Sequence, residues 1–182
     1  MRLRPFVLSA ALLSLVSLTA AGQNAQGDQV SAKAQERIIK EVRHELLMLP
    51  YLGVFDYIAY KVDGYNVTLM GQVVRPILKS DAEGAVKHIE GVEKVDNQIE
   101  VLPTSPMDDR LRRRLFHAIY AYPALEKYSL GVQKPIRIIV KNGHVALEGV
   151  VDSEADKNLA GVRANGVPGI FSIDNHLQVV KP

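Results

Sequence analysis

The chain contains neither cysteine nor tryptophan. Without a thiol it cannot form disulfides, build thiolate metal sites, use a cysteine nucleophile or carry a lipid on an N-terminal cysteine. Its 182 residues include 22 basic and 20 acidic side chains, for a formal charge of +2. This near balance gives little support to nucleic-acid binding through net charge. With 47% hydrophobic and 23% charged residues, the composition is that of a folded globular protein.

Residues 1–22 have the three-part layout of a secretory signal peptide. Arg2 and Arg4 form a basic start, an apolar run covers residues 6–18, and small residues follow at 19–22. The apolar run is shorter than the roughly 20 residues that a membrane-spanning helix needs. We therefore predict cleavage near Ala21, a periplasmic location, and a polar, flexible tether over residues 23–33.

The remainder of the chain is a tandem duplication. Three segment pairs match at a spacing of 78 residues: Val67–Val73 with Val145–Val151, Gly91-Val92 with Gly169-Ile170, and Val95–Val101 with Ile173–Val179. Near the start of each copy the spacing is 73, which predicts five extra residues in the second copy between Tyr128 and Ile136. We expect a first repeat over 34–102, a proline-stiffened linker over 103–107 and a second repeat over 108–180.

Both repeats show the same order of hydrophobic periodicities. In the first, apolar residues at helical spacing predict a helix over 34–49, and alternating strands around Asp63-Gly64 predict a β-hairpin. A second helix from Pro76 and a closing strand follow. In the second repeat, Asp108 and Ser153 are the expected helix caps, and Val162 belongs to the expected buried stripe, best aligned at a spacing of 77.

The order αββαβ places the last strand parallel to its neighbour, after a right-handed crossover. We therefore predict an α+β protein of two tandem αββαβ units. Each unit is a small mixed three-stranded sheet with two helices on one face. Because a unit of this size buries too little surface to be very stable alone, the two repeats are candidates to pack on each other.

These segments resemble the BON domain family, bacterial modules of envelope and osmotic-stress proteins. The family pattern has a turn glycine, Val-x-Leu-x-Gly-x-Val, a helix, and Gly-Val-x-x-Val-x-Asn-x-Leu-x-Val. It is matched twice, by Gly64, Val67–Val73 and Gly91–Val101 and by Gly143, Val145–Val151 and Gly169–Val179. The resemblance implies an αββαβ fold and a non-catalytic module that associates with phospholipid surfaces or envelope partners. It carries over no ligand-binding residue.

Six residues shared by the repeats are interpreted as structural. Gly71 and Gly149 lie on the inward phase of a strand, where a glycine makes room for a close neighbour, which we expect to be a helix; a ligand slot is the alternative. The amides of Asn97 and Asn175 are expected to tie a loop backbone to the sheet. Gly91 and Gly169 are expected to adopt a positive φ between helix and strand.

No pattern of residues indicates catalysis or cofactor binding. None of the five histidines is spaced for zinc, and the serine-hydrolase, phosphate-loop and dinucleotide-binding motifs are absent from the sequence. The acid pair Asp108-Asp109 stands where a helix begins, which favours a capping role over acid–base chemistry. We expect no enzyme activity, cofactor, metal or small-molecule substrate.

Two segments are candidate contacts with lipid or phosphate. Arg110, Arg112, Arg113 and Arg114 crowd the first turns of a helix, where positive charge is unfavourable. They form either a solvated helix face or an anionic-lipid contact; nucleic acid is disfavoured by export. Tyr51, Phe55 and Tyr57 lie in one short loop that either enters a lipid interface or folds over the sheet edge.

The sequence leaves two hypotheses for function. The first is an exported binding module held on an anionic phospholipid surface of the cell envelope by weak contacts from both repeats. The second is an assembly module that docks on an envelope protein or on itself through apolar surface such as Leu47. Neither hypothesis involves nucleic acid.

Overall fold

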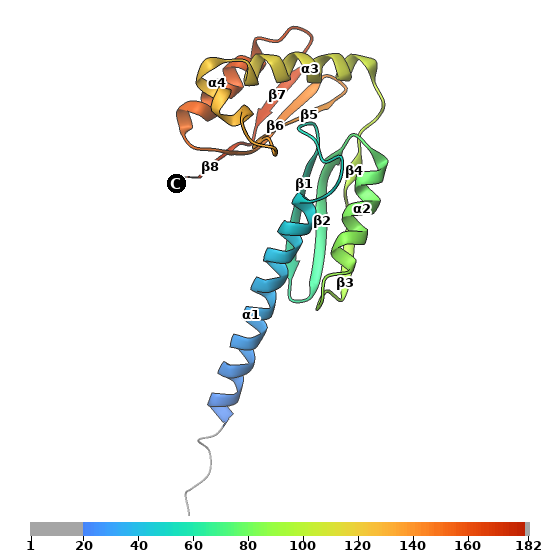
Figure 1. Ribbon diagram of the computed structural model, residues 1–182, viewed down its shortest axis with the longest axis vertical. Coiled ribbons are helices and arrows are strands. Elements are labelled where there is room, and N and C mark those ends of the chain that lie inside the picture. The colour runs from blue at the N-terminus through green and yellow to red at the C-terminus, as the bar shows by residue number, and fades with distance from the viewer. Residues whose placement is uncertain (1–19, 181–182) are drawn as a thin grey trace, which may run out of the picture.

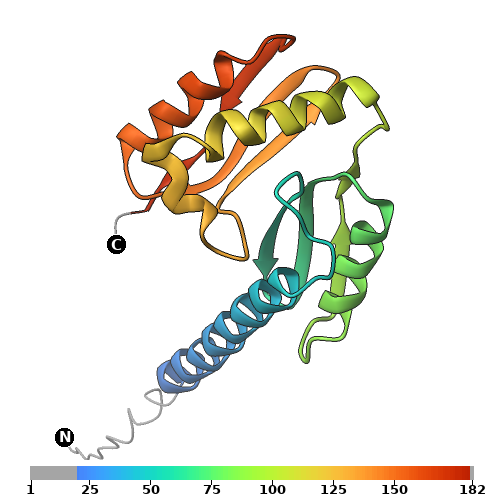
Figure 2. The same cartoon turned by 45° about the horizontal axis from the view of Figure 1, so that its top comes forward.

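The structure is a computed structural model that describes residues 20–180. Its first repeat contains α1 (Ala20–Leu47), β1 (Tyr57–Asp63), β2 (Asn66–Val73), α2 (Pro76–Lys87), β3 (Lys94–Asn97) and β4 (Glu100–Val101). The second contains α3 (Pro106–Tyr120), the 3-10 helix η1 (Pro123–Ser129), β5 (Ile136–Lys141), β6 (His144–Val151), α4 (Glu154–Asn165), β7 (Ser172–Asn175) and β8 (Gln178–Val179). The repeats are visible as two units in Figures 1 and 2.

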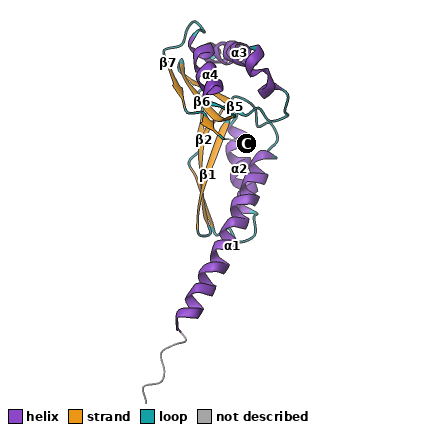
Figure 3. Cartoon of the chain, turned by 90° about the vertical axis from the view of Figure 1, so that its left-hand side faces the viewer, coloured by secondary structure: helices purple, strands orange, loops and turns teal. Residues whose placement is uncertain are grey.

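Each repeat is a mixed sheet with helices on one face, so the predicted fold class is confirmed. β1 pairs with β2 in antiparallel fashion, and β3 and β4 then pair with β2 in parallel. The second sheet has the same pairing. The closing strand predicted as one segment is broken into two short strands, which gives each sheet four strands. Figure 3 shows the strands on one side and the helices on the other.

Each repeat has its own hydrophobic core. In the first repeat the inward faces of α1 and α2 meet the sheet at Ile38, Leu78 and Leu69, which are fully buried. In the second, Leu111, Ala160 and Leu147 lie in the corresponding places. Two separate cores joined by a short linker make the repeats distinct packing units.

The spacing between the repeats corrects two sequence predictions. The buried residues of α2 and α4 align at 78, as Ala82 with Ala160 shows, rather than at 77. Val162, predicted to be buried, is therefore 69% exposed. The five extra residues lie in η1, before the position predicted, where Leu125 and Tyr128 fill the end of the second core.

Helix α1 begins earlier than predicted. Residues 23–33, expected to form a flexible tether, belong to α1 in the structure. This segment contains no proline and is rich in alanine and glutamine, so nothing in it stops the helix. The predicted signal peptide falls mainly on residues 1–19, outside the described residues. Within residues 20–180 no helix is long and apolar enough to cross a bilayer.

Gly71 and Gly149 stand at close approaches between strands. Gly71 has φ +118°, and a Cβ placed on it would collide with the carbonyl oxygen of Tyr57 in the neighbouring strand. Gly149, at φ +110°, faces the carbonyl oxygen of Pro135 in the same way. The close neighbour is thus the preceding strand backbone and not a helix, as we had expected. Gly91 and Gly169 also have positive φ, at 92° and 95°.

Asn97 and Asn175 connect a helix to the broken closing strand. Asn97 Nδ2 donates to the carbonyl oxygen of Lys79 at 2.8 Å, and Asn175 Nδ2 donates to that of Lys157 at 2.8 Å. Each side-chain oxygen accepts from the amide two residues later. The backbone they hold is helical, whereas the sequence suggested a loop. They replace ladder bonds where the strand is interrupted.

Candidate functional site

The four arginines of α3 fall into two groups. Arg112 is only 3% exposed and donates to the carbonyl oxygen of Val140 and to Asp109 Oδ1, both at 2.6 Å. Its Nε is buried without a hydrogen-bond partner. Arg112 therefore ties α3 to β5, and it is removed from the set of candidate lipid contacts.

Arg110, Arg113 and Arg114 are exposed. Arg110 contacts the sulfur of Met107 at 3.7 Å, and Arg114 donates weakly to the carbonyl oxygen of Pro168 at 3.4 Å. Within the described part of the chain, no carboxylate lies within 4.0 Å of any of the three guanidinium groups. This face of α3 therefore carries three positive charges without counter-ions.

Two exposed apolar side chains lie near the start of the same helix. Met107, in the first turn of α3, is 60% exposed, and Phe171, in the turn before β7, is 79% exposed. Figure 1 places the turn before β7 beside α3, and the contact between Arg114 and Pro168 agrees. We call Met107, Arg110, Arg113, Arg114 and Phe171 the α3 patch.

Phe171 and Met107 were missed by the sequence analysis. Phe171 is an aromatic residue between the loop glycine Gly169 and the inward position Ile173, so its outward phase was a readable signal. Its closeness to α3 was not readable, because it depends on how the α4–β7 turn packs. The Phe171 amide donates to the carbonyl oxygen of Gly143 at 2.9 Å, which holds the ring beside His144.

Asp108 has a different role from the predicted helix cap. Ser105 caps α3, since its hydroxyl accepts from the Asp108 amide at 3.2 Å. The carboxylate of Asp108 is almost fully buried and accepts from the amides of Asn142 and Gly143 at 2.8 and 2.9 Å. Asp108 thus fixes the β5–β6 turn against the start of α3, the helix that carries the arginines of the α3 patch.

The aromatic loop of the first repeat faces the second repeat. Phe55 packs edge-on against Phe116 of α3 with ring centroids 6.4 Å apart, and it is partly buried against the second core. Tyr57 lies in β1, half-buried, where burial and the nearby Glu148 raise its pKa. Tyr51 is 67% exposed with Arg75 stacked on its ring. The three predicted lipid contacts do not form one surface.

Two hydrogen bonds to backbone carbonyls of the same loop join the repeats. The Ile138 amide donates to the carbonyl oxygen of Val54 at 2.9 Å, and Arg137 Nη1 donates to that of Gly53 at 2.7 Å. Burial lowers the pKa of Arg137. On the other side of the contact, Lys141 and Glu100 form an ion pair at 2.5 Å. Gly53 and Val54 therefore lie against the edge of β5, in a turn that the Asp56 amide closes by donating to the Gly53 carbonyl oxygen at 3.2 Å.

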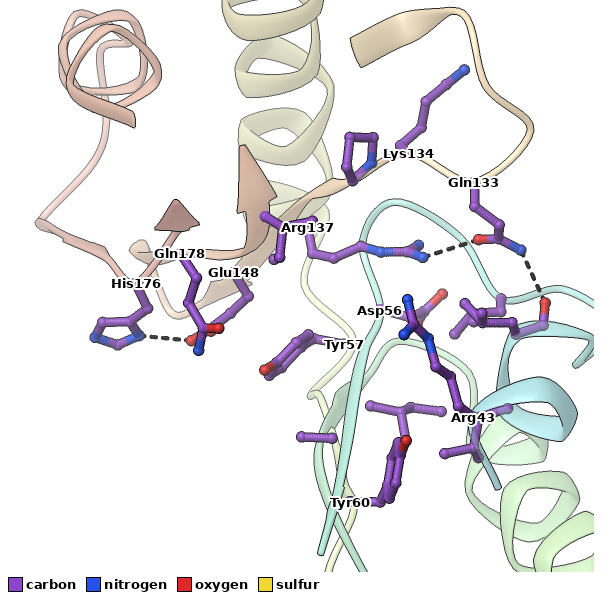
Figure 4. A pocket seen from close by; sticks show the side chains of 18 residues that line it. Arg43, Asp56, Tyr57, Tyr60, Gln133, Lys134, Arg137, Glu148, His176 and Gln178 are labelled. Carbon is purple, nitrogen blue, oxygen red and sulfur yellow. Dashed lines mark hydrogen bonds and ion pairs between the residues drawn. The ribbon is translucent and has the colours of Figure 1, made fainter. Parts of the chain in front are cut away.

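A groove of about 540 Å³ opens between the repeats next to this contact. Residues Tyr57 to Tyr60 of β1 line one side, and Gln133 to Pro135 with part of β6 line the other. Arg43 from α1 and Arg137 from β5 point into it (Figure 4). No group of three histidine or acidic residues suited to a metal ion occurs among residues 20–180.

Two αββαβ repeats, each around its own core, define this molecule as a tandem-repeat α+β protein. The family model described as BON domain matches residues 34–103 and 108–181. The chain belongs to the BON domain family, whose domains are generally non-catalytic binding modules. Tandem BON domains indicate a module associated with the cell envelope.

Curated proteins and solved structures were also compared with the chain. No curated protein matches the chain. Two solved structures of CdsD, a structural protein of the type III secretion system of Chlamydia trachomatis, are distantly similar. One is 13% identical, covers 80% of this chain and 93% of its own, and has a TM-score of 0.29. The other, of the C-terminal domain, is 12% identical, with coverage of 79% and 97% and a TM-score of 0.28.

Proposed function

We propose that the protein is an exported, non-catalytic module that binds anionic phospholipid surfaces of the cell envelope through the α3 patch. The observation that carries this proposal is the set of three exposed arginines without counter-ions on α3, with the exposed ring of Phe171 near the start of the same helix. Guanidinium groups bind phosphate in a bidentate manner, and aromatic rings suit the boundary between headgroups and acyl chains. The signal-peptide layout of residues 1–22 supports a periplasmic location.

The corresponding surface of the first repeat argues for a contact made by the second repeat alone. At the helix spacing of 73, Arg110 and Arg113 correspond to Arg37 and Lys40. Arg37 is paired with Glu90 at 3.1 Å, and Lys40 with Glu36 at 2.7 Å. At the strand spacing of 78, Glu93 stands in place of Phe171. The first repeat thus has neither free cations nor an exposed ring there, which replaces our expectation of contacts from both repeats.

The burial of Arg112 supports a membrane contact by the other three arginines of α3. Arg112 holds α3 against β5, so the neighbouring arginines project from a helix fixed to the sheet. Arginines near an acidic membrane contribute about 1 kcal/mol each. Removing three of them is therefore expected to weaken binding by about a hundredfold.

Cosedimentation with vesicles tests the proposal. The chain should sediment with phosphatidylglycerol-containing vesicles at low salt, remain free with phosphatidylcholine vesicles, and be released by high salt. The triple change Arg110→Ala, Arg113→Ala, Arg114→Ala should abolish sedimentation. The matched change Arg37→Ala, Lys40→Ala in α1 should leave it intact. Equal losses in both variants, or no binding at low salt, would refute the proposal.

A further inference from the structure

The loops that lead into β1 and β5 contain the same tripeptide. Leu52-Gly53-Val54 and Leu130-Gly131-Val132 lie 78 residues apart, the spacing that relates the two sheets. In the first repeat this tripeptide lies along the free edge of β5, where the carbonyl oxygen of Val54 accepts from the Ile138 amide. The edge of the second sheet is thus occupied at one point by a backbone carbonyl of the first repeat.

The loop of the second repeat makes no such contact. Leu130 is 82% exposed and Val132 is 99% exposed. An equivalent contact would place the Val132 carbonyl against the edge of β1, and among residues 20–180 no backbone hydrogen bond joins Val132 to that edge. The edge strand of the first repeat is therefore uncovered where that of the second is covered.

A reversal of charge explains the difference between the loops. In the first repeat the buried Asp56 carboxylate accepts from the amides of Gly53 and Val74 at 2.9 and 2.7 Å, and the Val54 carbonyl faces β5. Lys134 stands at the equivalent place in the second repeat. Its ammonium group donates to the carbonyl oxygens of Ser129 and of Gly131, the latter at 2.8 Å. Lys134 thus holds carbonyl groups of its own loop, whereas Asp56 holds amide groups.

The open edge of β1 presents backbone groups suited to another strand. Tyr60 pairs with Leu69 as Ile138 pairs with Leu147, so the Tyr60 amide points off the sheet as the Ile138 amide does. Among residues 20–180, the Tyr60 amide donates to no backbone carbonyl outside the sheet. Gln35 of α1 covers the far end of the strand by donating to the carbonyl oxygen of Val62 at 3.3 Å. The open stretch is Tyr57 to Tyr60.

This stretch forms one wall of the 540 Å³ groove, and the other walls indicate what fits. Leu47, Leu52 and Val150 supply apolar surface. The guanidinium groups of Arg43 and Arg137 face the groove (Figure 4), and neither has a carboxylate within 4.0 Å in the described part of the chain. Glu148, the nearby acid, lies 2.6 Å from the ring of His176. The second lining acid, Asp56, is buried and accepts from two amides, so the more accessible charges of the groove are mainly basic.

We propose that this groove binds an extended acidic segment of a partner protein, which adds as a strand to β1 at Tyr57–Tyr60. Main-chain hydrogen bonds to the strand edge supply affinity, and Arg43 and Arg137 select segments with carboxylate side chains. A volume of about 540 Å³ lies in the usual range for binding sites. The inference does not depend on the proposed function, because the groove and the α3 patch share no residue.

A synthetic peptide of alternating valine and glutamate tests the proposal with the full chain. Fluorescence anisotropy should show binding of this peptide. It should show none of the valine–lysine peptide, and none of a valine–glutamate peptide N-methylated at every residue, which has no backbone N–H to donate to a strand edge. Amide resonances of Ile58 and Tyr60 should shift on binding. Absence of binding, or binding that N-methylation does not weaken, would overturn the proposal.

Charge reversals distinguish the groove from the α3 patch. Arg43→Glu should weaken peptide binding at least about tenfold and leave vesicle binding unchanged. Arg110→Glu should do the opposite. If Arg43→Glu instead weakens vesicle binding and no peptide binds, the groove holds lipid and the proposal fails. If the Tyr60 amide shifts with protein concentration alone, the occupant is another molecule of the same chain, and the proposal fails also.

Discussion

Arg112 donates a hydrogen bond of 2.6 Å to the carbonyl oxygen of Val140, and this contact separates it from the other arginines of α3. The carbonyl belongs to β5, at the hairpin turn that Asp108 also holds. The start of α3 is thus fixed to the sheet by two buried charged side chains. The α3 patch depends on this support.

Arg112→Ala should lower the free energy of unfolding by about 2 kcal/mol, because it leaves a buried carbonyl without its charged donor. Urea unfolding of the full chain measures the change. Arg113→Ala is the control: because this side chain is exposed, the change should alter stability by less than about 0.5 kcal/mol. Equal effects of the two changes would contradict the assignment of Arg112 to the core.

Gly149→Ala should destabilise the second repeat by at least about 2 kcal/mol. Its φ of +110° is unfavourable for alanine, and the added Cβ would collide with the carbonyl oxygen of Pro135. Gly84→Ala is the matched control, since nothing lies within 4 Å of a Cβ at this helical position. That change should stabilise the chain by about 0.5–1 kcal/mol. A stabilised Gly149→Ala variant would show that the close approach is absent in solution.

Stability should fall in acid partly through Asp156. Burial raises the pKa of this carboxyl, but hydrogen bonds from Lys127, Tyr128 and Ser153 outweigh burial and hold the pKa below its ordinary value. A carboxyl with a folded pKa below its unfolded value of about 3.9 stabilises the fold above that pH. The contribution is lost as the pH falls through the folded pKa.

Asp156→Asn should therefore be less stable than the wild type at neutral pH, and the difference should shrink as the pH falls below about 4. Urea midpoints measured over a pH series test this. Lys127→Met removes one of the donors and should reproduce part of the effect. A stability difference that stays constant down to the acid limit would contradict the account.

Phe55→Ala should loosen the contact between the repeats without affecting membrane binding. The ring packs against Phe116 and the second core, so its loss should cost about 2 kcal/mol in unfolding free energy. Tyr51→Ala, at a side chain 67% exposed, should be nearly neutral. Vesicle cosedimentation should be unchanged in both variants. If only Phe55→Ala lost sedimentation with vesicles, Phe55 would be a membrane contact and this prediction would be wrong.

The fold was readable from the sequence because it follows from local patterns. Leu69 and Leu147, for example, occupy the same place in the pattern Val-x-Leu-x-Gly-x-Val, 78 residues apart, and both are fully buried. The burial prediction failed where a shift of one residue along a helix moves a side chain from the buried face to the exposed face. Val162 was assigned inward by a spacing one residue too short, and it is exposed.

The candidate sites were less predictable, because they depend on contacts between distant segments. The arginine cluster was visible in the sequence, but a long side chain can turn inward, as Arg112 does to reach Val140. Phe55 was an aromatic loop residue whose burial depends on the position of the second repeat. The exchange of Asp56 for Lys134 can be read from the sequence, yet its consequence appears only from the backbone groups that each side chain holds.

The central claim is that Phe171 and its neighbouring arginines meet an anionic membrane. Because the chain has no tryptophan, Phe171→Trp introduces a unique fluorescent probe in the α3 patch, and Tyr65→Trp places a control in the β1–β2 turn. We predict a blue shift of Phe171→Trp emission on addition of phosphatidylglycerol vesicles, reversed by high salt, and no shift for Tyr65→Trp. Unchanged emission from Phe171→Trp under conditions where the protein sediments with the vesicles would contradict the account.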